Sequence, residues 1–87
     1  MIYVDRLRIH DPRRACGYPT CHLATDGELN ELHGFAASIG VPRMAFHARA
    51  SHPHYDLREH HRALAVAAGA IEVSSKDLVR TCFRKKT

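Results

Sequence analysis

Three short β-prone runs alternate with three helical stretches along this 87-residue chain, and this alternation limits the fold more than any other feature. The β-prone runs are residues 21–24, 44–47 and 70–73, and a helical stretch follows each of them. Such an order favours parallel strands joined by right-handed crossovers, with helices covering the sheet. A further β-prone run at residues 2–4 is expected to join this sheet in either direction. The predicted fold is a single α/β domain over residues 1–87, with two or three layers, a mostly parallel four-stranded sheet and three helices.

Local signals mark the ends of the expected helices. Residues 25–28 (TDGE) match a capping box before the first helix, and Asp56 precedes the second helix as a cap. Gly40 and Gly69 supply the left-handed residues that end these two helices. The serine pair at 74–75 caps the last helix.

The composition, with 45% hydrophobic and 25% charged residues, is that of an ordinary globular protein. No apolar run approaches the roughly 20 residues that a membrane-spanning helix needs. The first residues turn charged too early for a signal peptide, so we expect a cytoplasmic protein that contacts no membrane. Cys16, Cys21 and Cys82 form no C-x-x-C pair. Reduced thiols are therefore expected, rather than a disulfide framework or a zinc ribbon.

The net charge of +4 favours an anionic partner, such as a phosphate-containing ligand or a nucleic acid. The basic residues gather in a long irregular loop at residues 6–20 and in a basic tail at residues 84–87. A frayed, solvated tail explains the second cluster equally well. Arginine binds phosphate oxygens bidentately, which makes the loop arginines candidate substrate-binding residues. They are Arg6, Arg8, Arg13 and Arg14.

Polar side chains follow several of the expected strands. In an open parallel sheet, ligands bind beyond the carboxyl ends of the strands. This rule brings together Asp5, His47 and the segment at residues 52–56, with Tyr55 and Ser74 as further substrate-binding candidates at the same edge. The candidate catalytic residues are Asp5, His22, His47, His54 and Asp56.

The segment at residues 52–56 (HPHYD) is the most specific feature. Alternate residues of an extended stretch face the same way, so His52, His54 and Asp56 are candidate metal ligands. Imidazole and carboxylate together suit zinc, manganese, iron or nickel. A metal-free alternative uses His47 or His54 as a proton carrier, because the ordinary imidazole pKa lies near neutral pH. Two plainer roles stay open: Asp56 as a helix cap, and His52 and His54 as solvated loop residues.

The chain also resembles a small family of bacterial and phage proteins. The shared pattern is YVD at 3–5, CHL at 21–23, ELH at 31–33, HYDL at 54–57, RALA at 62–65 and GAIEVS at 69–74. The resemblance covers nearly the whole chain, and the family is a domain of unknown function. It implies a one-domain protein of about this length, often from actinobacteria or their phages. It implies no activity, cofactor or catalytic residue.

Two functions from different classes follow from these features. The first is a hydrolase that acts on a phosphoester of a nucleotide or nucleic acid, with the histidine and aspartate residues holding a divalent metal or acting as acid and base. The alternative is a non-catalytic bacterial or phage accessory module that binds nucleic acid or a host protein through its basic loop. A homodimer formed through the last helix is a third, structural hypothesis.

Overall fold

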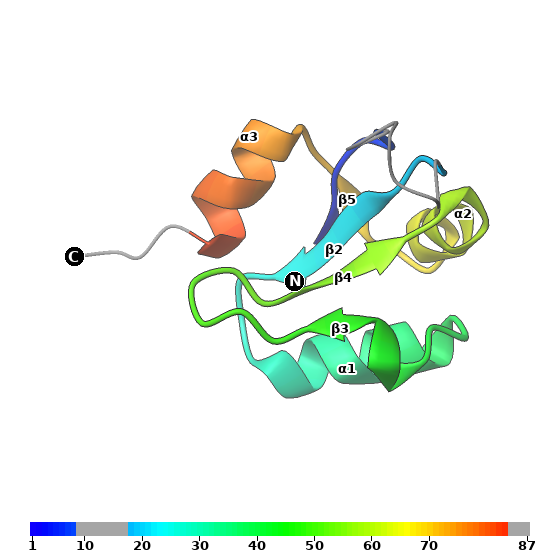
Figure 1. The fold of residues 1–87 in the computed structure, drawn as a ribbon, viewed down its shortest axis with the longest axis horizontal. Coiled ribbons are helices and arrows are strands. Elements are labelled where there is room, and N and C mark those ends of the chain that lie inside the picture. Colours follow the sequence, from blue (N-terminus) through cyan, green and yellow to red (C-terminus); the bar gives the residue numbers. More distant parts are fainter. Residues whose placement is uncertain (9–17, 84–87) are drawn as a thin grey trace.

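A five-stranded sheet forms the centre of the computed structural model, which describes residues 1–8 and 18–83 (Figure 1). Its strands are β1 (Ile2–Val4), β2 (Cys21–Thr25), β3 (Phe46–His47), β4 (His54–Leu57) and β5 (Ile71–Glu72). Across the sheet the order is β3-β4-β2-β1-β5. Only the β1–β5 pair is parallel among the described strands; the pairs β1–β2, β2–β4 and β3–β4 are antiparallel.

The prediction of a mostly parallel, four-stranded sheet was therefore wrong. The additional strand is β4, in a segment that the sequence pattern assigns to a loop and a helix cap. Both β2 and β3 are antiparallel to β4, so they point in the same direction and the crossover between them is a parallel one. The alternation of strands and helices predicts the direction of strands joined by a helix, but it does not predict that an antiparallel strand lies between them.

The helices are α1 (Leu29–Ser38), α2 (Glu59–Ala67) and α3 (Ser75–Leu78), with a 3₁₀ turn η1 (Arg43–Ala45) and a π-helical end η2 (Val79–Phe83). The glycines after α1 and α2 adopt positive φ, 84° at Gly40 and 106° at Gly69, which confirms the predicted helix ends. Ser74 caps α3, since its hydroxyl accepts the N–H of Asp77 at 3.1 Å.

The other two predicted N-caps were wrong. The residue before α1 is Glu28, and its side chain makes no cap hydrogen bond. The Thr25 hydroxyl instead accepts the N–H of Gly27 at 3.0 Å, which closes a turn. The residue before α2 is Arg58, while Asp56 lies inside β4. A strand position directs the Asp56 carboxylate to one face of the sheet instead of to the helix.

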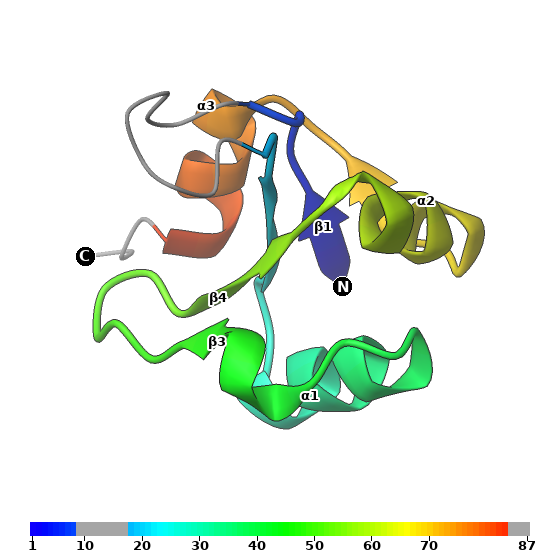
Figure 2. The same ribbon diagram turned by 45° about the vertical axis from the view of Figure 1, so that its right-hand side comes forward.

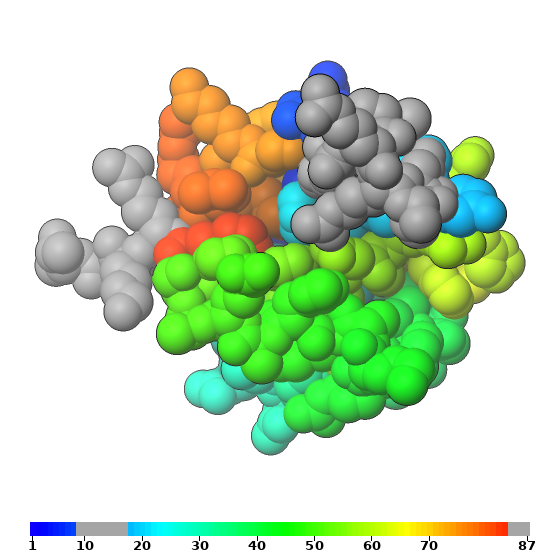
Figure 3. Space-filling model, viewed as in Figure 1, coloured from blue at the N-terminus to red at the C-terminus, as the bar shows by residue number. Residues whose placement is uncertain are grey.

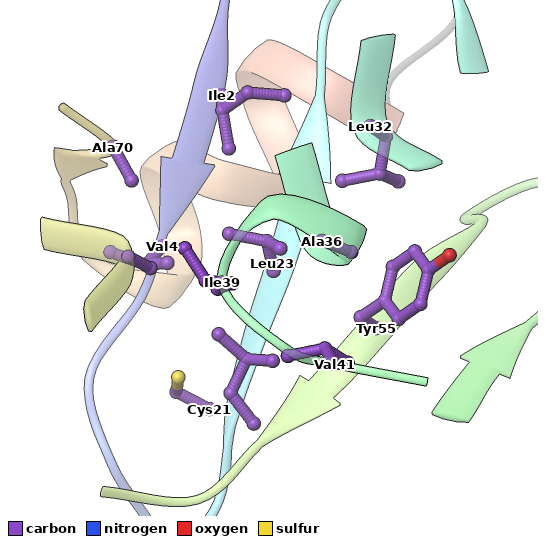
Figure 4. Close-up of a cluster of buried hydrophobic side chains, with 12 residues drawn as sticks. Ile2, Val4, Cys21, Leu23, Leu32, Ala36, Ile39, Val41, Tyr55 and Ala70 are labelled. Carbon is purple, nitrogen blue, oxygen red and sulfur yellow. The ribbon is translucent and has the colours of Figure 1, made fainter. Parts of the chain in front are cut away.

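Alternation along the strands gives the sheet an apolar face and a polar face. Val4, Leu23, Tyr55 and Leu57 are buried in one cluster with apolar residues of α1 and α2 (Figure 4). Figure 2 shows α1 and α2 on one side of the strands and α3 with η2 on the other. Leu78 of α3 is 1% exposed and lies outside that cluster. Helices therefore cover both faces of the sheet.

Two predicted basic segments fall largely outside the described residues. The loop at residues 6–20 is described only at its ends, where Arg8 and Thr20 form an antiparallel bridge. The arginines at 13 and 14 and the basic tail at 84–87 are not among the described residues. Of the helices in the described ranges, none has the length and apolar character to cross a bilayer.

Candidate metal centre and its pocket

Four polar side chains from three neighbouring strands meet on the polar face of the sheet. His22 of β2 lies opposite Asp56 of β4, and His47 of β3 lies opposite His54 of β4. His54 and Asp56 are two residues apart in one strand, so they point to the same face. Cross-strand partners share a face as well. The register of the sheet thus brings together histidines that are far apart in the sequence.

Three of these residues form a group that can hold a metal ion. One ligand atom each from His22, His54 and Asp56 lies within 4.8 Å of the others. Nε2 of His54 and Oδ1 of Asp56 are 3.3 Å apart. Two ligand atoms of a tetrahedral ion with bonds of about 2.1 Å lie about 3.4 Å apart. The distance between these two atoms of His54 and Asp56 therefore already suits a shared metal ion. The group differs from the predicted ligand set in one member, because His22 stands where the sequence pattern favours His52.

Asp5 holds the His22 ring from behind. Its carboxylate is buried; Oδ2 lies 2.8 Å from Nδ1 of His22, and Oδ1 accepts the backbone N–H of His22 at 2.6 Å. The Ser75 hydroxyl donates to Oδ2 at 3.0 Å. Burial by itself raises the pKa of Asp5, but these hydrogen bonds outweigh it and the pKa is lowered. The hydrogen bond to Asp5 raises the pKa of His22 against the opposing effect of burial.

This pairing determines which nitrogen of His22 suits a metal. When Asp5 is ionised and His22 is neutral, Nδ1 carries the proton and donates it to the carboxylate. Nε2 is then the nitrogen with a lone pair that a metal ion can accept. A carboxylate behind a histidine in this way is the usual outer partner of metal-ligating histidines, since it orients the ring and raises its basicity.

The His54 ring is also held through its Nδ1 atom, here by a backbone carbonyl in place of a carboxylate. Its Nδ1 lies 2.7 Å from the carbonyl oxygen of His52, and because a carbonyl oxygen only accepts, Nδ1 carries the proton. In the neutral ring, the lone pair of Nε2 therefore faces Oδ1 of Asp56 at 3.3 Å. A lone pair and a carboxylate oxygen repel each other unless a proton or a metal ion lies between them. The buried His54 side chain is thus held in an orientation that suits a cation.

His47 contacts the outer side of the same carboxylate. Its Nε2 lies 2.9 Å from Oδ2 of Asp56, and its ring stacks on that of His54 with centroids 5.0 Å apart. When the His54 ring carries a proton on Nε2 as well, that nitrogen donates to Asp56, and this hydrogen bond lowers the pKa of Asp56 against the opposing effect of burial. His47 has 47% of its side chain exposed, against 9% for His54, so it is the ring of this pair that solvent reaches.

A pocket of about 410 Å³ opens beside the metal group, between the sheet and α3 with η2. In Figure 3 the orange and red atoms of α3 and η2 border the green atoms of the segment that precedes β4. The His22 ring belongs to both the metal group and the pocket wall. The lining residues are Asp5, His22, Ser51, His52, Ser75, Leu78, Val79 and Phe83.

The five predicted catalytic residues form one continuous network in the structure: Asp5, His22, His47, His54 and Asp56. His52 lies next to it, and its ring stacks on His54 with centroids 5.8 Å apart. The basis of the prediction was wrong, however, because these residues meet on a face of an antiparallel region and not at the carboxyl edge of parallel strands.

The predicted substrate-binding residues are more scattered. Tyr55 points to the apolar face, where it is 1% exposed and its hydroxyl lies 2.7 Å from Nδ1 of His33. Ser74 is occupied as the cap of α3, whereas the neighbouring Ser75 reaches Asp5. Arg6 and Arg8 are exposed. The sequence did not identify three further pocket residues, Leu78, Val79 and Phe83. The helical period of the last stretch indicates only that they share an apolar face.

The two described cysteines do not offer thiolate chemistry. Burial raises the pKa of Cys21 to about 12 and that of Cys82 to about 11. Both thiols therefore stay protonated at neutral pH, which disfavours them as nucleophiles and as metal ligands.

Replacing Asp5 with asparagine should weaken zinc binding by about 10- to 100-fold. The carbonyl oxygen of the introduced amide is expected to keep the backbone N–H of His22, so the amide nitrogen would face Nδ1. That nitrogen donates a hydrogen bond, and the His22 proton would move to Nε2, where it competes with the metal. Zinc affinity measured by competition with a chelator dye checks this result.

Ser75→Ala is the matched control. It removes one donor to the same carboxylate and leaves the Asp5–His22 contact in place, so zinc affinity should change by less than about threefold. If Asp5→Asn binds zinc as tightly as the wild type does, Asp5 does not orient His22 as a metal ligand.

A family model described as a protein of unknown function (DUF4031) matches residues 2–85 of the chain. Comparison with curated proteins and with solved structures gave no match.

Proposed function

This chain belongs to the DUF4031 family of proteins of unknown function, and we propose that it is a hydrolase that cleaves a phosphoester with a divalent metal ion held by His22, His54 and Asp56. One observation carries the proposal: two histidines with their Nδ1 atoms already held by outer partners share a centre with a carboxylate, within 4.8 Å. Asp5 and the His52 carbonyl are those outer partners. Imidazole and carboxylate ligands suit zinc, manganese, iron or nickel.

A metal ion at this site would leave positions open for water and substrate, because the chain supplies three ligands. When bound, a divalent ion of this class polarises a phosphoryl oxygen and lowers the pKa of a bound water towards neutrality. In the overall reaction a water oxygen bonds to phosphorus, the bond from phosphorus to the ester oxygen breaks, and the ester oxygen leaves with a proton. We assign the proton transfer to His47, the solvent-exposed ring next to Asp56.

Arginine next to the centre supports a phosphate-containing substrate. Arg8 lies near enough that its positive charge opposes protonation of His22. Arg6 and Arg8 are both exposed on the segment that leaves β1, and a guanidinium binds two phosphate oxygens at once. These cations would balance the negative charges of Asp5 and Asp56 when a phosphate approaches.

The test is to purify the protein without a histidine tag, measure its metal content, and assay a panel of phosphomonoesters, phosphodiesters and nucleotides. We expect one metal ion per chain and a hydrolytic activity that a chelator abolishes. His54→Ala should lower both metal content and activity at least about 100-fold. His60→Ala changes an exposed histidine of α2 and should change neither.

Unchanged metal content and unchanged activity in His54→Ala would refute the hydrolase. The second candidate, a non-catalytic module that binds nucleic acid, is favoured by the exposed Arg6 and Arg8 and by Arg58, whose guanidinium stacks 4.0 Å from the centre of the exposed Tyr18 ring. It predicts binding that weakens steeply with salt and survives His54→Ala.

A further inference from the structure

We propose that the pocket next to the metal group binds an uncharged aromatic group of the substrate, so that the substrate is a small aromatic or nucleoside phosphoester. This inference rests on the proposed function, because it takes the reacting phosphate to lie at the metal group. It adds what the rest of the substrate is and where that part binds.

The shape of the pocket sets the size of its occupant. A volume of about 410 Å³ lies within the range of about 300–1,000 Å³ that is usual for small-molecule sites. The pocket is bounded on one side by the sheet and on the other by α3 and η2. A phenyl ring or a single nucleoside fits these dimensions, whereas a nucleic-acid duplex does not.

The charges of the wall indicate that the phosphate itself does not enter the pocket. None of the eight described lining residues is a lysine or an arginine. The carboxylate of Asp5, which repels anions, is already engaged by His22 and Ser75. Two described cations act on this region from outside the set of lining residues. The charge of Arg8 acts on His22, and Arg62 donates to the backbone carbonyl of Asp5 at 2.9 Å and pairs with Glu72. The anionic and the uncharged ends of a substrate are thus separated across the His22 ring.

Ring and apolar contacts favour an aromatic occupant. Phe83 meets the rings of His52 and His54 edge to face, with centroids 5.7 Å and 6.2 Å apart. Val79 is 51% exposed although it lines the pocket with the buried Leu78. Covering that surface with a flat ring removes apolar area from water and adds a further edge-to-face contact. Two serine hydroxyls lie in the lining, Ser51 next to Nδ1 of His52 and Ser75 donating to Asp5, and their oxygen atoms can accept a hydrogen bond from a polar edge of the ring.

The experiment compares phenyl phosphate with inorganic phosphate on the zinc-loaded protein, using calorimetry and ligand-observed NMR. We expect phenyl phosphate to bind about 10- to 100-fold more tightly, because it alone places a ring in the pocket. Phe83→Leu keeps apolar volume but removes the ring, and should weaken phenyl phosphate about five- to tenfold while leaving inorganic phosphate unchanged. Val79→Gln changes an exposed position, so folding should be unaffected. It too should weaken the binding of phenyl phosphate and leave the binding of inorganic phosphate unchanged.

Different failures separate the two proposals. Equal affinities for the two ligands would overturn the pocket assignment and leave the metal site standing. A protein that binds no zinc would overturn the proposed function; the pocket is then tested with phenol alone, where shifts of the Phe83 and His52 resonances support it and unchanged resonances refute it. A dimer in solution that buries Val79 and Phe83 would also refute it, because a second copy would occupy this surface.

Discussion

Replacing His22 with alanine should weaken zinc binding at least about 100-fold, whereas His52→Ala should leave zinc affinity within about threefold of the wild type. His22 contributes a ligand atom to the group with His54 and Asp56. His52 holds His54 through its backbone carbonyl, which alanine retains. The two variants therefore distinguish the ligand set of the structure from the set that the local H-x-H-x-D spacing favours.

Zinc affinity measured by chelator competition, with the metal content of the purified variants, gives the comparison. His60→Ala is the control, since it removes an exposed imidazole from α2 and changes the total number of histidines equally. Loss of zinc in His52→Ala together with full binding in His22→Ala would show that the metal group lies in the 52–56 segment alone. Equal losses in all three variants would indicate non-specific binding by surface histidines.

The difference between these two ligand sets shows what the sequence can predict about the site. The 52–56 spacing is a local pattern, and it correctly places His54 and Asp56 on one face. His52 precedes Pro53, and β4 begins only at His54, so the alternation does not extend back to it. The third ligand depends on the register between β2 and β4, where His22 lies opposite Asp56. No local pattern encodes that register.

For the fold as well, the sequence predicts features that depend on local residues and does not predict those that depend on long-range contacts. Gly40 and Gly69 end their helices as predicted, because a left-handed residue is a property of one position. Ser74 caps α3 for a similar local reason. The insertion of β4 between β2 and β3 is instead decided by which edges and faces bury the most apolar area across the whole domain. The prediction of a cap at Asp56 failed because a position before a helical stretch is compatible with both a cap and the end of a strand.

Leu23→Ala should lower the free energy of unfolding by about 2–5 kcal/mol, which is a large part of the roughly 5–15 kcal/mol available to a small domain. Leu23 lies at the centre of β2, is fully buried, and packs in the cluster that joins the sheet to α1 and α2 (Figure 4). Its removal leaves a cavity that β-sheet backbone cannot close. Urea unfolding followed by circular dichroism, with a chelator present, measures the change.

Leu64→Ala is the matched control, because the same atoms are removed from a side chain on α2 that is 40% exposed. Its free energy of unfolding is expected to fall by less than about 1 kcal/mol.

The Leu23 variant also tests whether the two faces of the sheet are independent of each other. The preceding residue in the chain, His22, points to the polar face, so the metal group should survive the cavity. Zinc at 100 times its dissociation constant adds about 2.7 kcal/mol to the folded state. It should therefore recover much of the stability that Leu23→Ala loses. A variant that zinc fails to stabilise, next to a wild type that zinc does stabilise, would show that packing on the apolar face holds the ligands in place and that the two faces are not independent.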